Sequence, residues 1–196
     1  MLEMPPRIAS LRRTAQGWPI PYFVERPVDG TLDFRVMHPQ RMVWALKRRL
    51  CWICGQPMGR HIAFVGGPLA IAQRQFSDPA SHRDCAEYAL RVCPFLASPA
   101  TERRDANMPA HAVLPGHHVR ANPGVSGLLL TGHYLFRDLI IHAGEAREVH
   151  WYTEGRPATR SEGEVAIEIA RRREEVQRHP HRDRILALLD KLSLPA

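Results

Sequence analysis

The chain has 196 residues, of which 44% are hydrophobic and 24% are charged, proportions that are typical of a globular protein. This length is enough for one domain of good size or two small ones. No apolar run approaches the about 20 residues that cross a bilayer, and the first residues lack the apolar stretch of a secretory signal. These features exclude a wholly disordered chain and a membrane span, and we expect a cytoplasmic protein.

The formal net charge is +7, and most of the excess lies in residues 1–60, which carry 10 basic and 4 acidic side chains. A basic surface attracts phosphate backbones and releases counterions when it binds them. The same charge is also consistent with a general preference for arginine, because Lys47 and Lys191 are the only lysines. Charge alone therefore leaves nucleic-acid binding and an ordinary solvated surface both open.

Two short motifs hold metal-ligand side chains at characteristic spacing. The first is Cys51-x-x-Cys54 followed by Gly55, the pattern of a zinc knuckle, in which glycine takes the positive φ of the tight turn. The second is His82-x-x-Cys85. Clustered cysteines in a reducing compartment favour metal or redox chemistry over disulfides.

The second motif is expected at the start of a helix, because Pro79 precedes it and Ser81 with Asp84 fits a capping box. Residues spaced i and i+3 in a first turn share one side of a helix, so His82 and Cys85 would point together. The sequence thus predicts a zinc site with four protein ligands, and a closed four-ligand site is structural and not catalytic. The ligands are Cys51, Cys54, His82 and Cys85.

The remaining cysteine, Cys93, lies eight residues after Cys85, which is about 12 Å along a continuous helix. One zinc ion with thiolate bonds of about 2.3 Å cannot use both, so we expect Cys93 to be a buried structural thiol. If the helix breaks before Pro94, Cys93 could instead replace His82 as a ligand.

Between the two motifs, the apolar runs Ile62–Val65 and Leu69–Ala72 flank Gly66-Gly67, which predicts a β-hairpin. A knuckle, a hairpin and a ligand-bearing helix in this order resemble the treble-clef zinc finger over residues 50–95. The His-Me finger nucleases share that arrangement, so a nuclease is also considered. His61 would be the base at the hairpin start, but it lacks the second histidine or aspartate beside it that such a site uses.

Upstream of the first motif, two strands over Tyr22–Glu25 and Leu32–Met37 are expected around an Asp29-Gly30 turn. A helix opening at Pro39 would follow and carry cations at its end, directly before the knuckle. Those cations form a candidate nucleic-acid contact, or merely a solvated helix end that complements the dipole. The candidate residues are Lys47, Arg48, Arg49 and Arg60.

Downstream, short apolar runs predict three or four antiparallel strands from Val125 onward, and then a helix capped by Thr159 or Ser161 and a short apolar final helix. The strands carry His133, His142 and His150, which would bind metal only if pairing gathered them. The expected fold is α+β, a treble-clef-like module followed by a small antiparallel sheet and C-terminal helices. Its parts are a flexible segment 1–16, a zinc-binding domain 17–97, an irregular connection 98–124 that contains His111, His117 and His118, and the strands and helices of 125–196.

Several strings, taken together, resemble small zinc-containing proteins encoded in phages, prophages and GC-rich bacteria. They are GWPIPYFV, DGTLDFR, CWICGQPMGR, FVGGP, SHRDCAEYA with CPFL, and WYTEGRPATRSEGEV, and they fall within residues 17–170. The resemblance implies a compact α+β protein and a phage or mobile-element context, but it brings no activity with it.

Three functions follow from these observations. The first is a zinc-stabilised binding protein that contacts nucleic acid, or a nucleic-acid-processing complex, through its Arg-rich surface. The second is a phage-encoded protein-interaction or inhibitor module that acts on a host protein. The third is a metal-dependent nuclease or hydrolase, which the sequence supports least because it shows no Ser-His-Asp order, phosphate-binding glycine loop or paired catalytic carboxylates.

Overall fold

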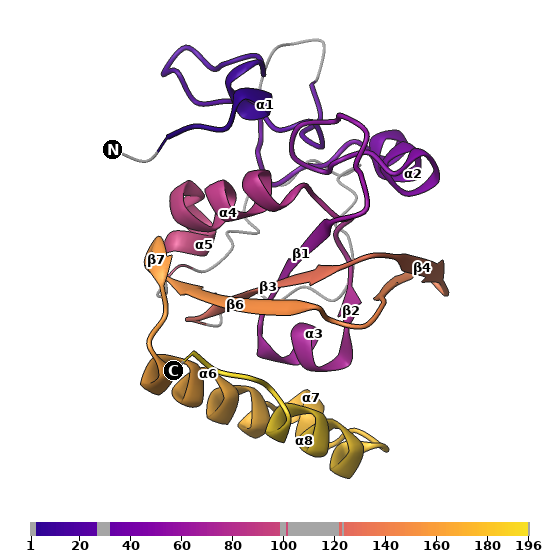
Figure 1. The fold of residues 1–196 in the computed structure, drawn as a ribbon, viewed down its shortest axis with the longest axis vertical. Coiled ribbons are helices and arrows are strands. Elements are labelled where there is room, and N and C mark those ends of the chain that lie inside the picture. Colours follow the sequence, from indigo (N-terminus) through magenta and orange to yellow (C-terminus); the bar gives the residue numbers. More distant parts are fainter. Residues whose placement is uncertain (1–2, 27–31, 99–100, 102–121, 123, 196) are drawn as a thin grey trace.

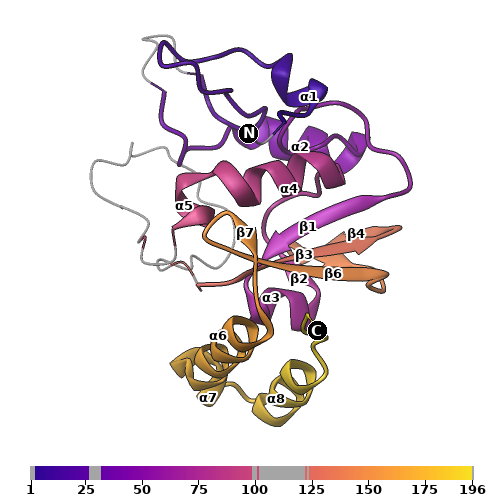
Figure 2. The ribbon, with the colours of Figure 1, turned by 60° about the vertical axis from the view of Figure 1, so that its left-hand side comes forward.

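The structure is a computed structural model that describes residues 3–26, 32–98, 101, 122 and 124–195. It combines helices with antiparallel sheet, as the sequence predicts (Figure 1). Helices lie on both sides of the strands, with α4 on one side and α3, α6, α7 and α8 on the other (Figure 2). No helix in the described part of the chain has both the length and the apolar character that crossing a membrane requires.

The main sheet has four strands in the order β1-β3-β6-β7, all antiparallel. They are β1 (Ile62–Gly66), β3 (Ser126–Thr131), β6 (Glu148–Thr153) and β7 (Arg156–Pro157). Every residue of β3 is buried, because its Leu128 and Leu130 pack with α4 while Leu129 faces the cluster that contains Ile71 of α3. Burial on both faces explains why this strand is a continuous apolar run and does not alternate.

A second sheet has the order β2-β5-β4. Its strands are β2 (Gln75–Phe76), β4 (Tyr134–Arg137) and β5 (Ile140–Ala143). The two-residue connection Asp138-Leu139 joins β4 to β5, and both residues have positive φ, 53° and 61°. The predicted strands after Val125 are therefore present, but they are divided between two sheets.

The eight helices among the described residues range from one turn to thirteen residues. They are α1 (Pro6–Ala9), α2 (Pro39–Arg48), α3 (Pro68–Gln73), α4 (Arg83–Val92), α5 (Pro94–Ala97), α6 (Arg160–Arg172), α7 (Glu174–Gln177) and α8 (Arg182–Asp190). The predicted helix from Pro39 is confirmed. Thr159 caps α6 in a full capping box with Glu162, which selects one of the two predicted caps.

The predicted hairpin after the knuckle is wrong. Leu69–Ala72 belongs to helix α3, and β1 pairs with the distant β3. The local sequence contains the reason: Pro68 occupies the first helical position after an extended Gly67, and alanine with glutamine favours helix over strand. The apolar run was compatible with either structure, and the proline decides between them.

The two strands predicted around Asp29-Gly30 are also wrong, because their contact is reduced to one bridge between Val24 and Met37. The reason is local, because each segment forms a turn of its own: the Val24 N–H donates to the carbonyl of Pro21, and the Val36 N–H donates to that of Asp33. These two N–H groups are therefore used within their own segments. The Asp29-Gly30 turn lies outside the described residues.

Candidate metal centre

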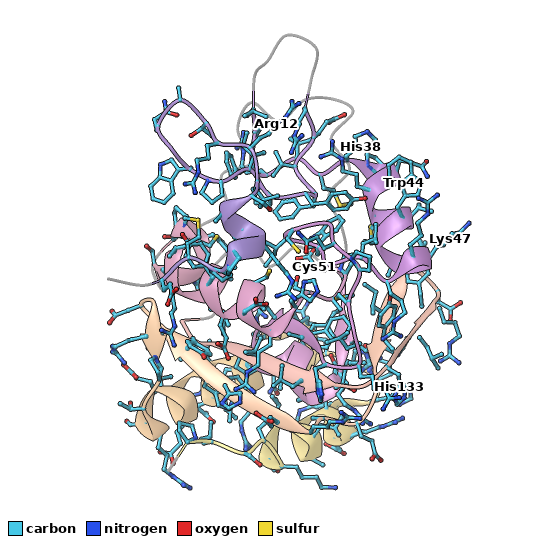
Figure 3. The ribbon with its side chains drawn as sticks, turned by 45° about the horizontal axis from the view of Figure 1, so that its top comes forward. Arg12, His38, Trp44, Lys47, Cys51 and His133 are labelled. Atoms are coloured by element: carbon cyan, nitrogen blue, oxygen red, sulfur yellow. The ribbon has the colours of Figure 1, made fainter. Side chains whose placement is uncertain are left out.

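Four side chains from two distant parts of the chain meet at one point. The ligand atoms of Cys51, Cys54, His82 and Cys85 all lie within 4.8 Å of one another, close enough to bind a metal ion. All four cysteines of the chain are free thiols. Figure 3 shows Cys51 inside the molecule beneath the N-terminal segment. The structure therefore gathers the four residues that the motif spacing predicts.

The first ligand pair is positioned by a closed knuckle. The backbone of Cys51 donates to Gln56 and accepts from Gly55, each at 2.8 Å. Gly55 has φ of +74°, and an added Cβ would lie 2.5 Å from the Tyr22 ring. Glycine is therefore required at this position for two reasons, the backbone conformation and the close approach of Tyr22.

The second ligand pair lies at the start of α4, but the predicted cap is wrong. Ser81 forms a bridge with Ala63 of β1 through two hydrogen bonds of 2.8 Å, so its backbone is extended and His82 is the N-cap. The helix then runs unbroken to Val92 and places Cys85 one turn after His82. The bridge anchors this ligand pair to the main sheet.

The His82 ring is oriented by a contact outside the ligand group. Its Nε2 lies 3.1 Å from the carbonyl oxygen of Pro57, and its Nδ1 lies 3.4 Å from the Cys54 sulfur. When Nε2–H donates to Pro57, the lone pair of Nδ1 points toward the three sulfurs. Such a partner on the far nitrogen is the usual way that a metal-binding imidazole is held in one tautomer.

The sulfurs differ in their electrostatic surroundings. Burial opposes ionisation of Cys51, but hydrogen bonds from Cys54, Cys85 and His82 outweigh it and lower the pKa of Cys51. Its sulfur also lies 3.5 and 3.4 Å from the backbone N–H groups of Cys54 and His82. The shared hydrogen bond with Cys51 raises the pKa of Cys54 to about 11 and also raises that of Cys85. Without metal the site favours one thiolate, and a cation would displace the remaining protons.

An apolar shell separates the site from solvent. Cys51 and Cys85 are fully buried and His82 is 9% exposed, and Ile8 of α1 packs on the cysteines with only 2% of its surface exposed. The partly buried residues around them are Met4, Leu11, Ile53, Met58 and Tyr88. The sequence predicts no role for residues 1–16 at this site. The signal in that segment is the spacing of Met4, Ile8 and Leu11, four and three residues apart, and all three pack here.

Cys93 lies outside the ligand group. It is the residue after α4 and is partly exposed, so the prediction of a buried thiol is wrong. The group found among the described residues contains His82 in its place. The unbroken helix keeps Cys93 away from Cys85, as the spacing argument requires.

The predicted basic residues cluster at the end of α2. Lys47 and Arg48 are exposed in its last turn, and Arg49 follows with φ of 53°. Figure 3 shows Lys47 and Trp44 on the outer side of this helix. Arg49 lies 5.6 Å from the centre of the Tyr134 ring and 3.5 Å from the carbonyl oxygen of Gly59, the neighbour of exposed Arg60.

The three histidines of the predicted strands, His133, His142 and His150, form no metal-binding group with one another. His142 is on β5 in one sheet, whereas His150 is on β6 in the other and lies 2.8 Å from Glu148. His61 is exposed beside the start of β1. Across the described ranges, the Cys–His cluster is the only group of three or more metal-ligand side chains that could hold a metal ion. His111, His117 and His118 lie outside these ranges.

No protein-family model matches the chain, and no match was found among curated proteins or solved structures. The phage-associated context therefore stays a prediction from the sequence strings.

Proposed function

We propose that this chain is a zinc-stabilised binding protein that contacts nucleic acid, or a nucleic-acid-processing complex, through the basic end of α2. The observation that carries the proposal is the direct attachment of this basic end to the metal knuckle. Arg49 is two residues before Cys51, and its carbonyl accepts from the backbone N–H of Met58 at 2.9 Å. A metal that fixes the knuckle therefore also fixes the direction in which the cations project.

Zinc is the ion that this ligand set favours. Three thiolates and one imidazole in a buried, closed group are typical of structural zinc and leave no position open for substrate. The knuckle and the ligand-bearing helix follow the treble-clef order, with β3 in place of the second hairpin strand beside β1. We infer that zinc holds the N-terminal region together and takes no part in chemistry.

The charge distribution on α2 supports phosphate binding. The helix contains no acidic residue, and Lys47, Arg48 and the nearby Arg60 are exposed with no carboxylate among their described contacts. By contrast, Arg156 and Arg160 near α6 are paired with glutamates. Unpaired exposed cations are available for phosphate contacts, which give affinity and strong salt dependence.

The test is a binding titration of the zinc-loaded protein with labelled single-stranded DNA, duplex DNA and RNA, each at several salt concentrations. The test variant changes Lys47, Arg48 and Arg60 to glutamine. The charge-matched control changes Arg172, Arg184 and Lys191 to glutamine on the C-terminal helices, at the opposite end of the molecule from α2 (Figure 1).

We expect the wild type and the control to bind with steep salt dependence. The α2 variant should bind weakly, with a log–log salt slope reduced by about 0.9 for each lost duplex contact. Absence of binding at low salt, or equal losses in both variants, would overturn the proposal. A partner search would then start from the protein-interaction alternative.

A further inference from the structure

The β4–β5 hairpin exposes large apolar side chains. Leu135, Phe136 and Leu139 are 69%, 46% and 83% exposed. They lie within five consecutive residues, and much of their apolar surface stays in contact with water. Clustered exposed apolar groups of this kind mark binding surfaces more often than scattered single residues do.

The turn of this hairpin is also costly for the fold. Asp138 and Leu139 both have positive φ, 53° and 61°, a conformation that two-residue hairpins usually give to Asn-Gly or Asp-Gly. A leucine there is strained, and its exposed side chain gains nothing from packing. Strain of this kind concentrates at functional positions.

The hairpin is fixed to the basic end of α2. The Tyr134 hydroxyl donates to the carbonyl oxygen of Leu46 at 3.0 Å, and Arg49 lies over the same ring. Phe136 is on the same face of β4 as Tyr134, since side chains two residues apart share a face. In Figure 1, β4 and α2 lie on the same side of the molecule. The hydrogen bond and the ring contact therefore place the start of β4 beside the end of α2.

Both elements expose aromatic side chains, and α2 adds exposed cations. Trp44 is 40% exposed, and the Arg48 guanidinium lies 5.7 Å from its ring centre, one turn further along α2. The one acidic residue of the hairpin, Asp138, is paired with Arg137. We call the exposed aromatic, basic and apolar side chains of α2 and the hairpin the stacking surface. It consists of Trp44, Lys47, Arg48, Phe136 and Leu139.

We propose that the stacking surface binds unpaired nucleic-acid bases, with Trp44 and Phe136 stacking on bases and Lys47 and Arg48 pairing with phosphates. The inference rests on the proposed function and narrows it to single-stranded nucleic acid. Cations with exposed aromatic rings are the combination that single-strand binding uses, because every base has a π-face. Duplex DNA hides those faces, and it needs the cations but not the rings.

The experiment compares a labelled oligothymidine with a duplex of equal length, using the zinc-loaded full chain. The test variants are Trp44→Ala and Phe136→Ala. Their matched controls are Trp18→Ala and Ile169→Ala, which remove residues that are 53% and 52% exposed elsewhere. Thermal unfolding checks that each variant stays folded, as expected for exposed positions.

We expect each test variant to lose about tenfold in single-strand affinity, within the range measured for one stacked base, while duplex affinity changes little. The controls should match the wild type. Unchanged single-strand binding in both test variants would overturn this inference. The proposed function would survive that result if binding still required Lys47 and Arg48.

Two other outcomes are also decisive. Absence of binding to any nucleic acid would remove the proposed function and this inference together. A concentration-dependent dimer that Phe136→Ala dissociates, measured by sedimentation without nucleic acid, would show that a second copy covers the hairpin and would overturn the inference.

Discussion

The Nε2 atom of His82 lies 3.1 Å from the carbonyl oxygen of Pro57. This contact joins the start of α4 to the loop that follows the knuckle, so it links the two ligand pairs outside the ligand group. It also fixes which imidazole nitrogen is free. The metal should therefore be bound through Nδ1, which already lies 3.4 Å from the Cys54 sulfur.

Nitrogen NMR of the zinc-loaded protein checks this assignment. We expect His82 to show a protonated Nε2 and a metal-bound Nδ1, because the Pro57 carbonyl can only accept a hydrogen bond. A spectrum with Nε2 bound to the metal would contradict the observed ring orientation.

Removal of a ligand should be far more damaging than removal of the other thiol. Cys54→Ser leaves three ligands around a buried ion, and we expect loss of bound zinc and destabilisation by about 4 kcal/mol or more. Cys93→Ser is the control, since Cys93 is partly exposed at the end of α4. It should keep one zinc per chain and change stability by less than about 1 kcal/mol.

Zinc content by atomic absorption and unfolding by denaturant measure both effects. Equal zinc content in the two variants would show that Cys54 is not a ligand. Loss of zinc in Cys93→Ser would indicate the alternative ligand set, with Cys93 in place of His82.

The ionised side chain of Glu162 should contribute to the free energy of unfolding, and this contribution should be lost at acidic pH. Hydrogen bonds from Arg156, and then from the Thr159 backbone and hydroxyl, lower the pKa of Glu162 to about 2. Because the folded value lies below the ordinary value of about 4.3, this contribution is complete above about pH 4.3 and is lost as the pH falls toward 2.

A carboxyl NMR titration measures this shift directly. The Glu162 signal should stay in its ionised position down to about pH 3.5 in the wild type. In Arg156→Ala it should move at higher pH, because the main cause of the shift is gone. An ordinary midpoint in the wild type would contradict the observed ion pair.

The crossing of β3 with α3 depends on Gly127. A Cβ there would lie 2.6 Å from Cγ1 of Ile71 and 3.0 Å from Cζ3 of Trp151. Gly127→Ala should destabilise the protein by about 1–3 kcal/mol, as overpacking does in other cores. Gly59→Ala is the control, since nothing lies within 4 Å of the position that its added methyl group would take, and it should stay within about 0.5 kcal/mol of the wild type. Denaturant unfolding of both variants measures the difference, and equal stabilities would contradict the close packing at Gly127.

The ligand pairs could be predicted from the sequence because each depends on short-range geometry. Two residues between Cys51 and Cys54, and two between His82 and Cys85, set the separations whatever the rest of the chain does. The Thr159 cap and the strands after Val125 have the same local character. The prediction of a hairpin strand over Leu69–Ala72 was wrong for a local reason too, since Pro68 starts a helix there.

Tertiary structure alone decided what surrounds these local elements. The pairing of β1 with β3, the cover of Ile8 over the cysteines and the bond from Tyr134 to Leu46 each join segments far apart in the sequence. Such contacts form because buried strands need partners for every backbone group and apolar side chains need cover from water. The sequence by itself determined which residues can hold the metal. The folded chain determined how they are enclosed and which exposed side chains lie beside the basic end of α2.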